Sequence, residues 1–245
     1  MDDRVHVSLD DTKGCFKYLA AHPDTESIFD TRVLGFLKEL HDEYGTGFTL
    51  LCIYKSGDFT LDQVSDRYQK EFLENRDWLH FGFHAYEENR DYSRAGAEQI
   101  QEEYQITMKQ LKRITGADSF SKIIRLHRFA GNLEVCRALK ELGIRCLLTA
   151  DDERLSYYLE TGLCRTVRQC GSYRDQEEGI CFCRSLPRLE HCQNPAADMQ
   201  MADEQGYPLI SVFTHEWQMD RDEIKNRMRE CCIWEQMHRS KQSCF

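Results

Sequence analysis

The chain has 245 residues, of which 41% are hydrophobic and 30% charged, a composition typical of a globular protein with one sizeable core. Its net charge of −10 argues against a nucleic-acid-binding protein, which needs a basic surface to contact phosphates. The longest apolar runs, such as 48–54, are too short for a transmembrane helix, and the N-terminus lacks the pattern of a signal peptide. We therefore expect a cytoplasmic protein with no membrane or nucleic-acid partner.

The first half of the chain alternates strand-like and helix-like segments. From Val5 to Asp10, apolar and polar residues alternate with the period of two that predicts a strand. Helical spacing follows over 31–44, with Asp30 or Thr31 placed to cap its start. Next come a predicted strand at 48–54, a helix at 61–73, a strand at 78–84 and a helix at 94–114 that Gly116 ends.

The second half continues this alternation with one interruption. A strand is predicted at 122–127, a helix at 133–142, a strand at 145–150, a strand at 209–214 and a helix at 220–237. Residues 155–207 show no clear period. Alternating strands and helices indicate βα units and a parallel sheet. Six strands are countable and the unclear stretch has room for one or two more, which favours one barrel domain over 1–245 rather than an open doubly wound sheet.

The chain contains twelve cysteines, and a reducing compartment makes free thiols the expectation. They are densest at Cys164, Cys170, Cys181, Cys183 and Cys192. Because no CxxC pair occurs there, the spacing is only a weak indication of structural zinc.

Polar residues collect where the predicted strands end, which is where parallel α/β folds carry their functional groups. These strand ends hold Asp10-Asp11, His84, His127 with Arg125 two residues earlier, Asp151-Asp152, and His215-Glu216. Five strand ends with acidic or imidazole groups would converge on one rim of the barrel, a stronger indication of a site than any single motif.

The adjacent carboxylates Asp10 and Asp11 suit a divalent metal, since one can bind the ion while the other takes a proton from water. A capping role fits equally well, because Asp is common at helix N-termini and another helix can follow Thr12. The residues alone favour neither interpretation.

His80 and His84 lie in a strand, where four residues span about 13 Å, so the two cannot bind one ion. His84 lies at the useful end, and we expect His80 to be buried in the barrel or hydrogen-bonded. Glu88 follows His84 by four residues and could return from a turn as a ligand. The placement of His127 and His215 on separate strand ends favours a shared site.

The motifs together resemble the polysaccharide deacetylase superfamily over residues 5–217. The resemblance is carried by Ser8-Leu9-Asp10-Asp11-Thr12, Gly82-Phe83-His84, Arg125 near Gly131, Leu139 to Ile144, and Thr214-His215. It implies a distorted barrel of about seven parallel strands and a metal-dependent hydrolase that deacetylates an N-acetylated sugar or another small amide. It also implies that Asp10 is the base, Asp11 a metal ligand, His84 the first histidine ligand and His215 the general acid.

The sequence departs from the family pattern at two places. Glu88 stands where the family has its second metal-binding histidine, and no proline follows Arg125, which would orient Asp10 or bind the substrate. The third ligand is therefore left open between His127, the first choice, Glu88 and His80. One divalent ion is expected, zinc first, while a more oxygen-rich site would admit iron, cobalt or manganese.

Two other functions remain open. A binding protein for carbohydrates or small molecules could keep the barrel and lose the chemistry, as the missing histidine suggests. A glycoside hydrolase would instead pair Asp10 with Asp151, Asp152 or Glu216, with no metal between them. The sequence does not reveal the oligomeric state.

Overall fold

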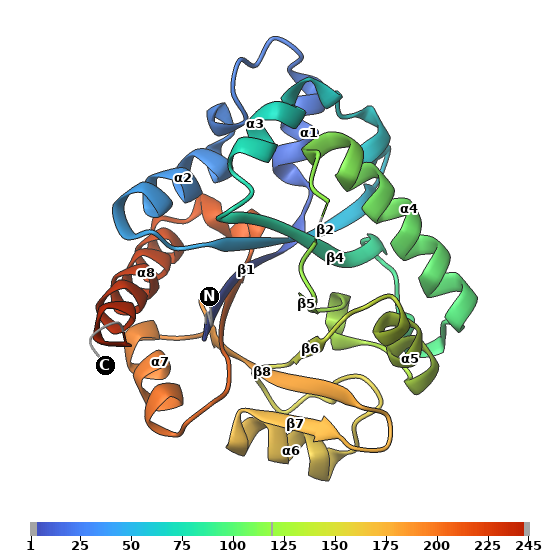
Figure 1. Ribbon diagram of the computed structural model, residues 1–245, viewed down its shortest axis with the longest axis vertical. Coiled ribbons are helices and arrows are strands. Elements are labelled where there is room, and N and C mark those ends of the chain that lie inside the picture. Colours follow the sequence, from blue (N-terminus) through green and yellow to red (C-terminus); the bar gives the residue numbers. More distant parts are fainter. Residues whose placement is uncertain (1–3, 119, 243–245) are drawn as a thin grey trace.

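The computed structural model describes residues 4–118 and 120–242. Seven parallel strands in these residues curl into a barrel whose spatial order follows the chain, as Figure 1 shows. They are β1 (Val5–Thr12), β2 (Phe48–Ser56), β4 (Leu79–Glu87), β5 (Ile123–Ile124), β6 (Cys146–Thr149), β8 (Ile180–Arg188) and β9 (Ile210–His215). The distorted barrel of about seven parallel strands is confirmed.

The barrel is joined where its last strand returns to its first. β9 pairs with β1 in parallel, from Val5 opposite Ile210 to Asp10 opposite His215. β4 and β5 do not pair, but the backbone N–H of Ser121 donates to the Phe81 carbonyl at 2.8 Å and so links β4 to the segment before β5. Two short strands, β3 (Phe59–Thr60) and β7 (Ser172–Asp175), add antiparallel pairs to β2 and β8.

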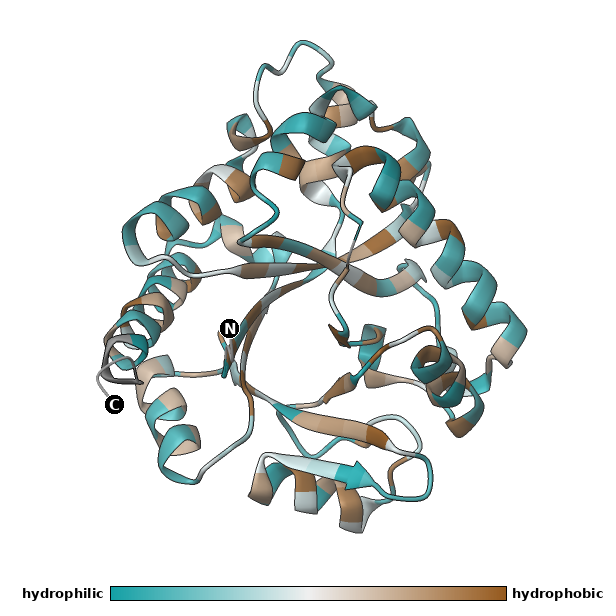
Figure 2. Cartoon of the chain, in the orientation of Figure 1, coloured by the Kyte–Doolittle hydropathy of each residue, from teal (hydrophilic) through white to brown (hydrophobic). Residues whose placement is uncertain are grey.

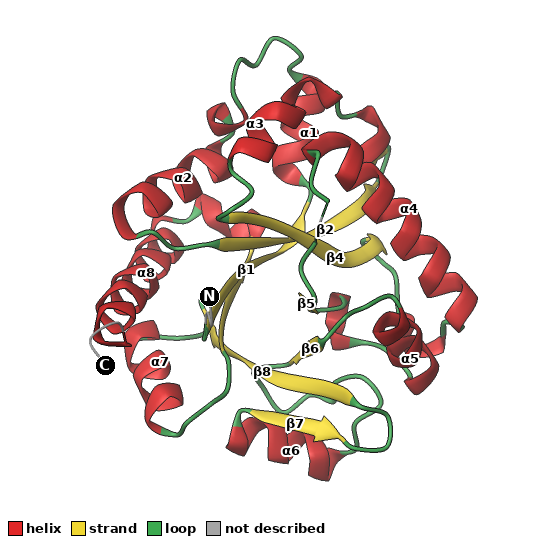
Figure 3. Ribbon diagram, viewed as in Figure 1, coloured by secondary structure: helices red, strands yellow, loops and turns green. Residues whose placement is uncertain are grey.

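Helices form the outer layer, as the colouring by secondary structure in Figure 3 shows. They are α1 (Gly14–Ala21), α2 (Arg32–Tyr44), α3 (Gln69–Glu74), α4 (Ala97–Thr115), α5 (Leu133–Glu141), α6 (Thr161–Cys170), α7 (Pro195–Glu204) and α8 (Asp222–Gln242). In Figure 2 their hydrophobic positions alternate with hydrophilic ones, whereas β2 and β4 are largely hydrophobic. No helix within the described ranges is both long and apolar enough to cross a membrane.

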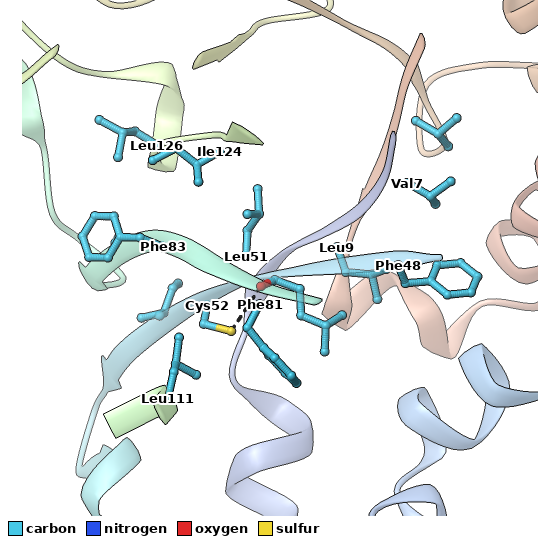
Figure 4. Close-up of a cluster of buried hydrophobic side chains, with 14 of the residues drawn as sticks. Val7, Leu9, Phe48, Leu51, Cys52, Phe81, Phe83, Leu111, Ile124 and Leu126 are labelled. Atoms are coloured by element: carbon cyan, nitrogen blue, oxygen red, sulfur yellow. Dashed lines mark hydrogen bonds between the residues drawn. The ribbon is translucent and has the colours of Figure 1, made fainter. Parts of the chain in front are cut away.

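The main core lies between the sheet and the helices that cover it. Leu51, Phe83, Leu111 and Ile124 are fully buried, and Figure 4 shows Leu51 and Ile124 on one side of β2 and β4 and Leu111 on the other. Burying apolar surface on both faces of these strands explains why they are continuous apolar runs rather than alternating ones.

Two expectations about individual elements are wrong. The helix predicted over 61–73 is two 3₁₀ turns followed by the short α3, because the Ser65 hydroxyl accepts from the Arg67 N–H and competes with helix formation. The strand predicted at 122–127 is only β5, since the chain turns at His127–Phe129, where Arg128 has φ of 60°. The stretch 155–207, where the sequence left room for one or two further strands, contains β7 and β8 together with α6 and α7, so that expectation is confirmed.

Candidate active site at the carboxyl ends of the strands

The two neighbouring aspartates reach one group of side chains because β1 is irregular at its end. Consecutive side chains of a regular strand point to opposite faces. The pairing of β1 with β2 shifts between Leu9 and Thr12, and Asp11 has a left-handed φ of 55°. Asp10 contacts Arg125 while Asp11 contacts His84, and His84 Nδ1 is 2.6 Å from the Arg125 carbonyl oxygen.

Arg125 is fully buried inside the barrel and holds Asp10 in place. Its Nη1 donates to Asp10 Oδ1 at 2.6 Å. Its guanidinium lies 3.9 Å from the centre of the Phe213 ring. A buried guanidinium needs both a counter-charge and hydrogen-bond acceptors, and Asp10 supplies the first. The acceptors are inward-facing serine hydroxyls from three strands: Ser8, Ser185 and Ser211.

Asp11 faces two imidazoles. Its Oδ1 lies 3.2 Å from His84 Nε2 and 3.9 Å from His127 Nε2. Burial would raise the pKa of Asp11, but the close contact and charge of His84, with the more distant charges of His215 and His127, hold it well below its usual range. Burial lowers the pKa of His127, and the charge of His84 lowers it further.

These donor atoms fit a divalent metal ion. His84 Nδ1 faces the Arg125 carbonyl at 2.6 Å, so in the neutral ring Nδ1 carries the proton and the lone pair of Nε2 points toward Asp11. Asp11 Oδ1 is buried without a hydrogen-bond partner of its own. The atoms of Asp11, His84 and His127 do not all lie within 4.8 Å of one another, so the group is wider than a closed metal site.

The other two candidates for the third ligand lie apart from this group. Glu88 forms an ion pair with Lys13, and the hydrogen bond from Lys13 lowers the pKa of Glu88. His80 is exposed, so of the two expectations for it, burial or a hydrogen bond, burial is excluded. Of the three candidates, only His127 contacts Asp11 among the interactions of the described residues.

His215, at the end of β9, is held by a glutamate that the sequence did not reveal. Its Nδ1 is 2.7 Å from Glu190 Oε1, and the same oxygen accepts the backbone N–H of His215 at 2.8 Å. Burial would raise the pKa of Glu190, but the hydrogen bond and charge of His215 lower it to about 2. Glu190 follows β8 by two residues, so the strand-end rule would have found it had β8 been visible in the sequence.

The acidic pair after β6 separates into two environments. Asp151 lies 3.7 Å from Arg188 Nη1 and 3.4 Å from His191 Nδ1. Arg188 also reaches Glu190 at 3.3 Å, which links Asp151 to the His215 side of the rim. Asp152 instead forms an ion pair with Arg154, at 2.6 Å.

Glu216 has the capping role that was open for Asp11. Its carboxylate accepts the backbone N–H groups of Lys13, Gly14 and Cys15 at 2.8, 2.5 and 2.7 Å. These are the unpaired donors at the start of α1, and a carboxylate also interacts favourably with the helix dipole there. The cap residue itself is Lys13, without a side-chain cap, so Asp11 does not cap α1.

A groove leads away from Asp11 along α1. Its volume is about 360 Å³, and its walls include Lys13, Tyr18, Arg32 and Trp217. Trp217 is 60% exposed and its ring lies 5.6 Å from that of His215. An exposed indole beside a buried polar site is an amphipathic surface suited to a ligand with an apolar face and polar edges.

No family model and no curated protein matches the sequence. Among solved structures, one similar protein is from Mycobacterium smegmatis and is assigned as a polysaccharide deacetylase. The match covers 95% of this chain and 85% of that protein, at 11% identity and a TM-score of 0.54. A 4-alpha-glucanotransferase from Thermococcus litoralis matches 94% of this chain and 35% of its own, at 12% identity and a TM-score of 0.56.

A mutant of a CE4 family pseudoenzyme, with restored enzymatic activity, matches 97% of this chain at 12% identity and a TM-score of 0.50. The present chain spans 64% of the length of that protein and 61% of its wild-type form from Bacillus anthracis. At such identities the likeness concerns the fold.

Proposed function

We propose that this chain, whose fold is similar to that of a polysaccharide deacetylase, is a divergent member of that superfamily and a metal-dependent hydrolase. Its reaction is the removal of an acetyl group from the nitrogen of an N-acetylated sugar or another small amide. Water adds across the C–N bond, which breaks to give acetate and a free amine.

The observation that carries this proposal is the convergence of three donor groups beside a buried ion pair. His84 Nε2 and His127 Nε2 both face Asp11 Oδ1, and the Arg125–Asp10 pair is connected to them through the Arg125 carbonyl. Asp11, His84 and His127 would hold the ion. When bound, a divalent ion such as zinc polarises the amide carbonyl and lowers the pKa of water.

The remaining residues supply proton transfer and orientation. Asp10 acts as the base, and Arg125 fixes the direction of its carboxylate through the 2.6 Å contact. His215 gives a proton to the departing amine. Glu190 positions the His215 ring, because its carboxylate accepts the hydrogen bond at Nδ1.

The groove beside Asp11 supports a sugar or similar small substrate. Trp217 offers an exposed ring face within the same groove as Asp11, and Lys13 and Arg32 offer donors for hydroxyl or acidic groups. Replacing Trp217 with Ala should raise KM for such a substrate more than it lowers kcat.

A glycoside-cleaving enzyme is the second candidate, because the glucanotransferase shares the barrel. That chemistry needs a second carboxylate opposite Asp10. The Glu216 carboxylate is occupied by the backbone of α1, and Asp152 is paired with Arg154. Only Asp151 remains of the three carboxylates that the sequence offered, and Asp151→Asn should then abolish activity on glycosides.

Elemental analysis of the purified Asp11→Asn and His84→Ala variants tests the metal site, with Asp152→Asn as the matched control at a rim carboxylate bound to Arg154. We expect each site variant to lose one equivalent of metal and its activity on N-acetylated sugars, while the control keeps both. Full metal retention in both site variants would overturn the assignment. Metal binding without hydrolysis of any acetamide would favour the binding protein instead.

A further inference from the structure

Three thiols meet at the end of the barrel where strands β6 and β8 begin. Cys146 is the first residue of β6, and the pairing of the two strands places it opposite Cys181. Cys183 follows two residues later on β8 and therefore shares a face with Cys181. Ser185, which contacts Arg125 inside the barrel, lies on the same face, so the thiols point into the barrel below the candidate active site. Figure 1 shows β6 and β8 side by side.

The spacing of the three sulfur atoms fits a metal ion. All three Sγ atoms lie within 4.8 Å of one another, and those of Cys181 and Cys183 are 4.0 Å apart. Zinc–sulfur bonds of about 2.3 Å in tetrahedral geometry place neighbouring sulfurs about 3.8 Å apart. In residues 4–118 and 120–242, no other three His, Cys, Asp or Glu ligand atoms come together this closely.

The surroundings of the thiols separate this cluster from cysteines that only fill a core. Cys146 and Cys183 are buried among apolar side chains including Leu148 and Leu209, whereas Cys181 is half-buried and gives solvent a path to the cluster. Packing alone requires neither a half-exposed thiol nor convergence of three.

We propose that Cys146, Cys181 and Cys183 form a three-thiolate site for one thiophilic ion, Zn²⁺ or Cu⁺. Each thiol gives its proton to solvent when the ion binds. Thiolates select these ions, and three sulfurs satisfy trigonal Cu⁺ or leave one position of Zn²⁺ for a further ligand. Cys181 precedes Ser185 by four strand residues, about 13 Å, so this site is separate from Asp11. The proposal is independent of the hydrolase activity.

Cobalt titration of the metal-free full chain tests the site, because Co²⁺ bound by thiolates gives a sulfur-to-metal charge-transfer absorption that carboxylate and imidazole ligands do not give. The titration uses the Asp11→Asn/His84→Ala background, so that only the thiol cluster is measured. We expect the absorption to saturate at one equivalent. It should disappear in Cys181→Ser/Cys183→Ser and persist in Cys170→Ser, whose thiol is exposed on α6. Competition by Zn²⁺ and, without oxygen, by Cu⁺ then identifies the preferred ion.

Alkylation of the unmutated chain keeps the test valid if the double variant does not fold. Bound Zn²⁺ or Cu⁺ should protect Cys181 from alkylation at least tenfold, read by mass spectrometry, and leave Cys170 unprotected. The proposal is overturned if the charge-transfer absorption is absent, or if it is unchanged in the double variant. Equal alkylation of Cys181 with and without metal would overturn it as well, and so would a disulfide between any two of the three thiols in the protein purified under reducing conditions.

Discussion

Glu190 and Glu216 are both buried carboxylates near His215, yet they bind different partners. Glu216 accepts hydrogen bonds from three backbone N–H groups at the start of α1. Glu190 instead accepts from the ring and the backbone N–H of His215. The first role is structural and the second belongs to the candidate chemistry. Substitutions at these two residues should therefore separate stability from activity.

Replacing Glu216 with Ala leaves three N–H groups at the start of α1 without an acceptor. We expect a loss of about 1.5–3 kcal/mol in the free energy of unfolding, the range for hydrogen bonds to a charged group. Urea denaturation measures it, with Glu153→Ala as an exposed control. Metal content should stay unchanged, and a stability equal to that of the control would contradict the capping role.

Glu190 should make stability depend on pH. Its folded pKa of about 2 is below the unfolded value of about 4.3, so it stabilises the protein above the unfolded pKa, and this contribution is lost as pH falls toward the folded pKa. The full contribution is roughly 3 kcal/mol. Between pH 6 and pH 3, the stability advantage of the wild type over Glu190→Gln should shrink. A constant difference across that interval would refute the assignment.

The proximity of side chains was predictable where a recognised strand leads directly to the side chain. Asp10, Asp11, His84, Arg125 and His215 come together as the strand-end rule indicates. The role of Glu216 depends on α1, about 200 residues away in sequence, and no local pattern contains that information. The three serine hydroxyls that accept hydrogen bonds from Arg125 come from distant parts of the sequence, so no local pattern predicts them either.

At the scale of elements, the junction of α6 with β7 depends on one glycine. Gly171 ends α6 with a left-handed φ of 78°, and a Cβ there would overlap the ring of Tyr207. Gly171→Ala should lower the free energy of unfolding by about 2–4 kcal/mol, from backbone strain and overpacking combined.

Gly162 in the same helix provides the matched control. A Cβ at Gly162 has nothing within 4 Å, so Gly162→Ala should be neutral or stabilise by up to about 1 kcal/mol. Thermal unfolding of both variants checks the pair, and similar melting temperatures would contradict the argument.

Element types were predictable wherever the hydrophobic period was long. The helix at 94–114 corresponds to α4, whose left-handed Gly116 ends it as expected. The helical spacing of 61–73 does not give one continuous helix, because the Ser65 hydroxyl offers the backbone a local hydrogen-bond acceptor. The strand β5 is short because the chain turns at Arg128. β8 was missed because Arg184 and Arg188 interrupt its apolar character while still contacting the protein through Tyr207 and Glu190.

For the whole molecule, metal binding should raise the free energy of unfolding and therefore the Tm. A ligand at 100 times its Kd that binds only the folded chain adds about 2.7 kcal/mol, which is a rise of roughly 5–10 °C in Tm for a chain of this size. Zinc should raise the Tm of the Cys181→Ser/Cys183→Ser variant through the Asp11 site alone. The additional Asp11→Asn change should abolish that rise, and a rise that survives it would place the ion elsewhere.

The architecture as a whole was readable because strand and helix alternate along the chain and most of the parallel strands pair with the next parallel strand in sequence, β4 and β5 excepted. No residue pattern predicts the pairing of β9 with β1. It follows from the tilt and twist of the strands, which close a sheet of this kind into a barrel.

The left-handed backbone conformation of Asp11 costs stability, while the proposed reaction needs the carboxylate that Asp11 carries. Glycine relieves strain at such a φ, whereas alanine keeps it, so Asp11→Gly should be more stable than Asp11→Ala by about 1 kcal/mol although both lose the carboxylate. Among variants that lack this carboxylate, selection for heat resistance alone would therefore favour glycine over alanine, and the resulting barrel would lack the side chain that the proposed reaction needs.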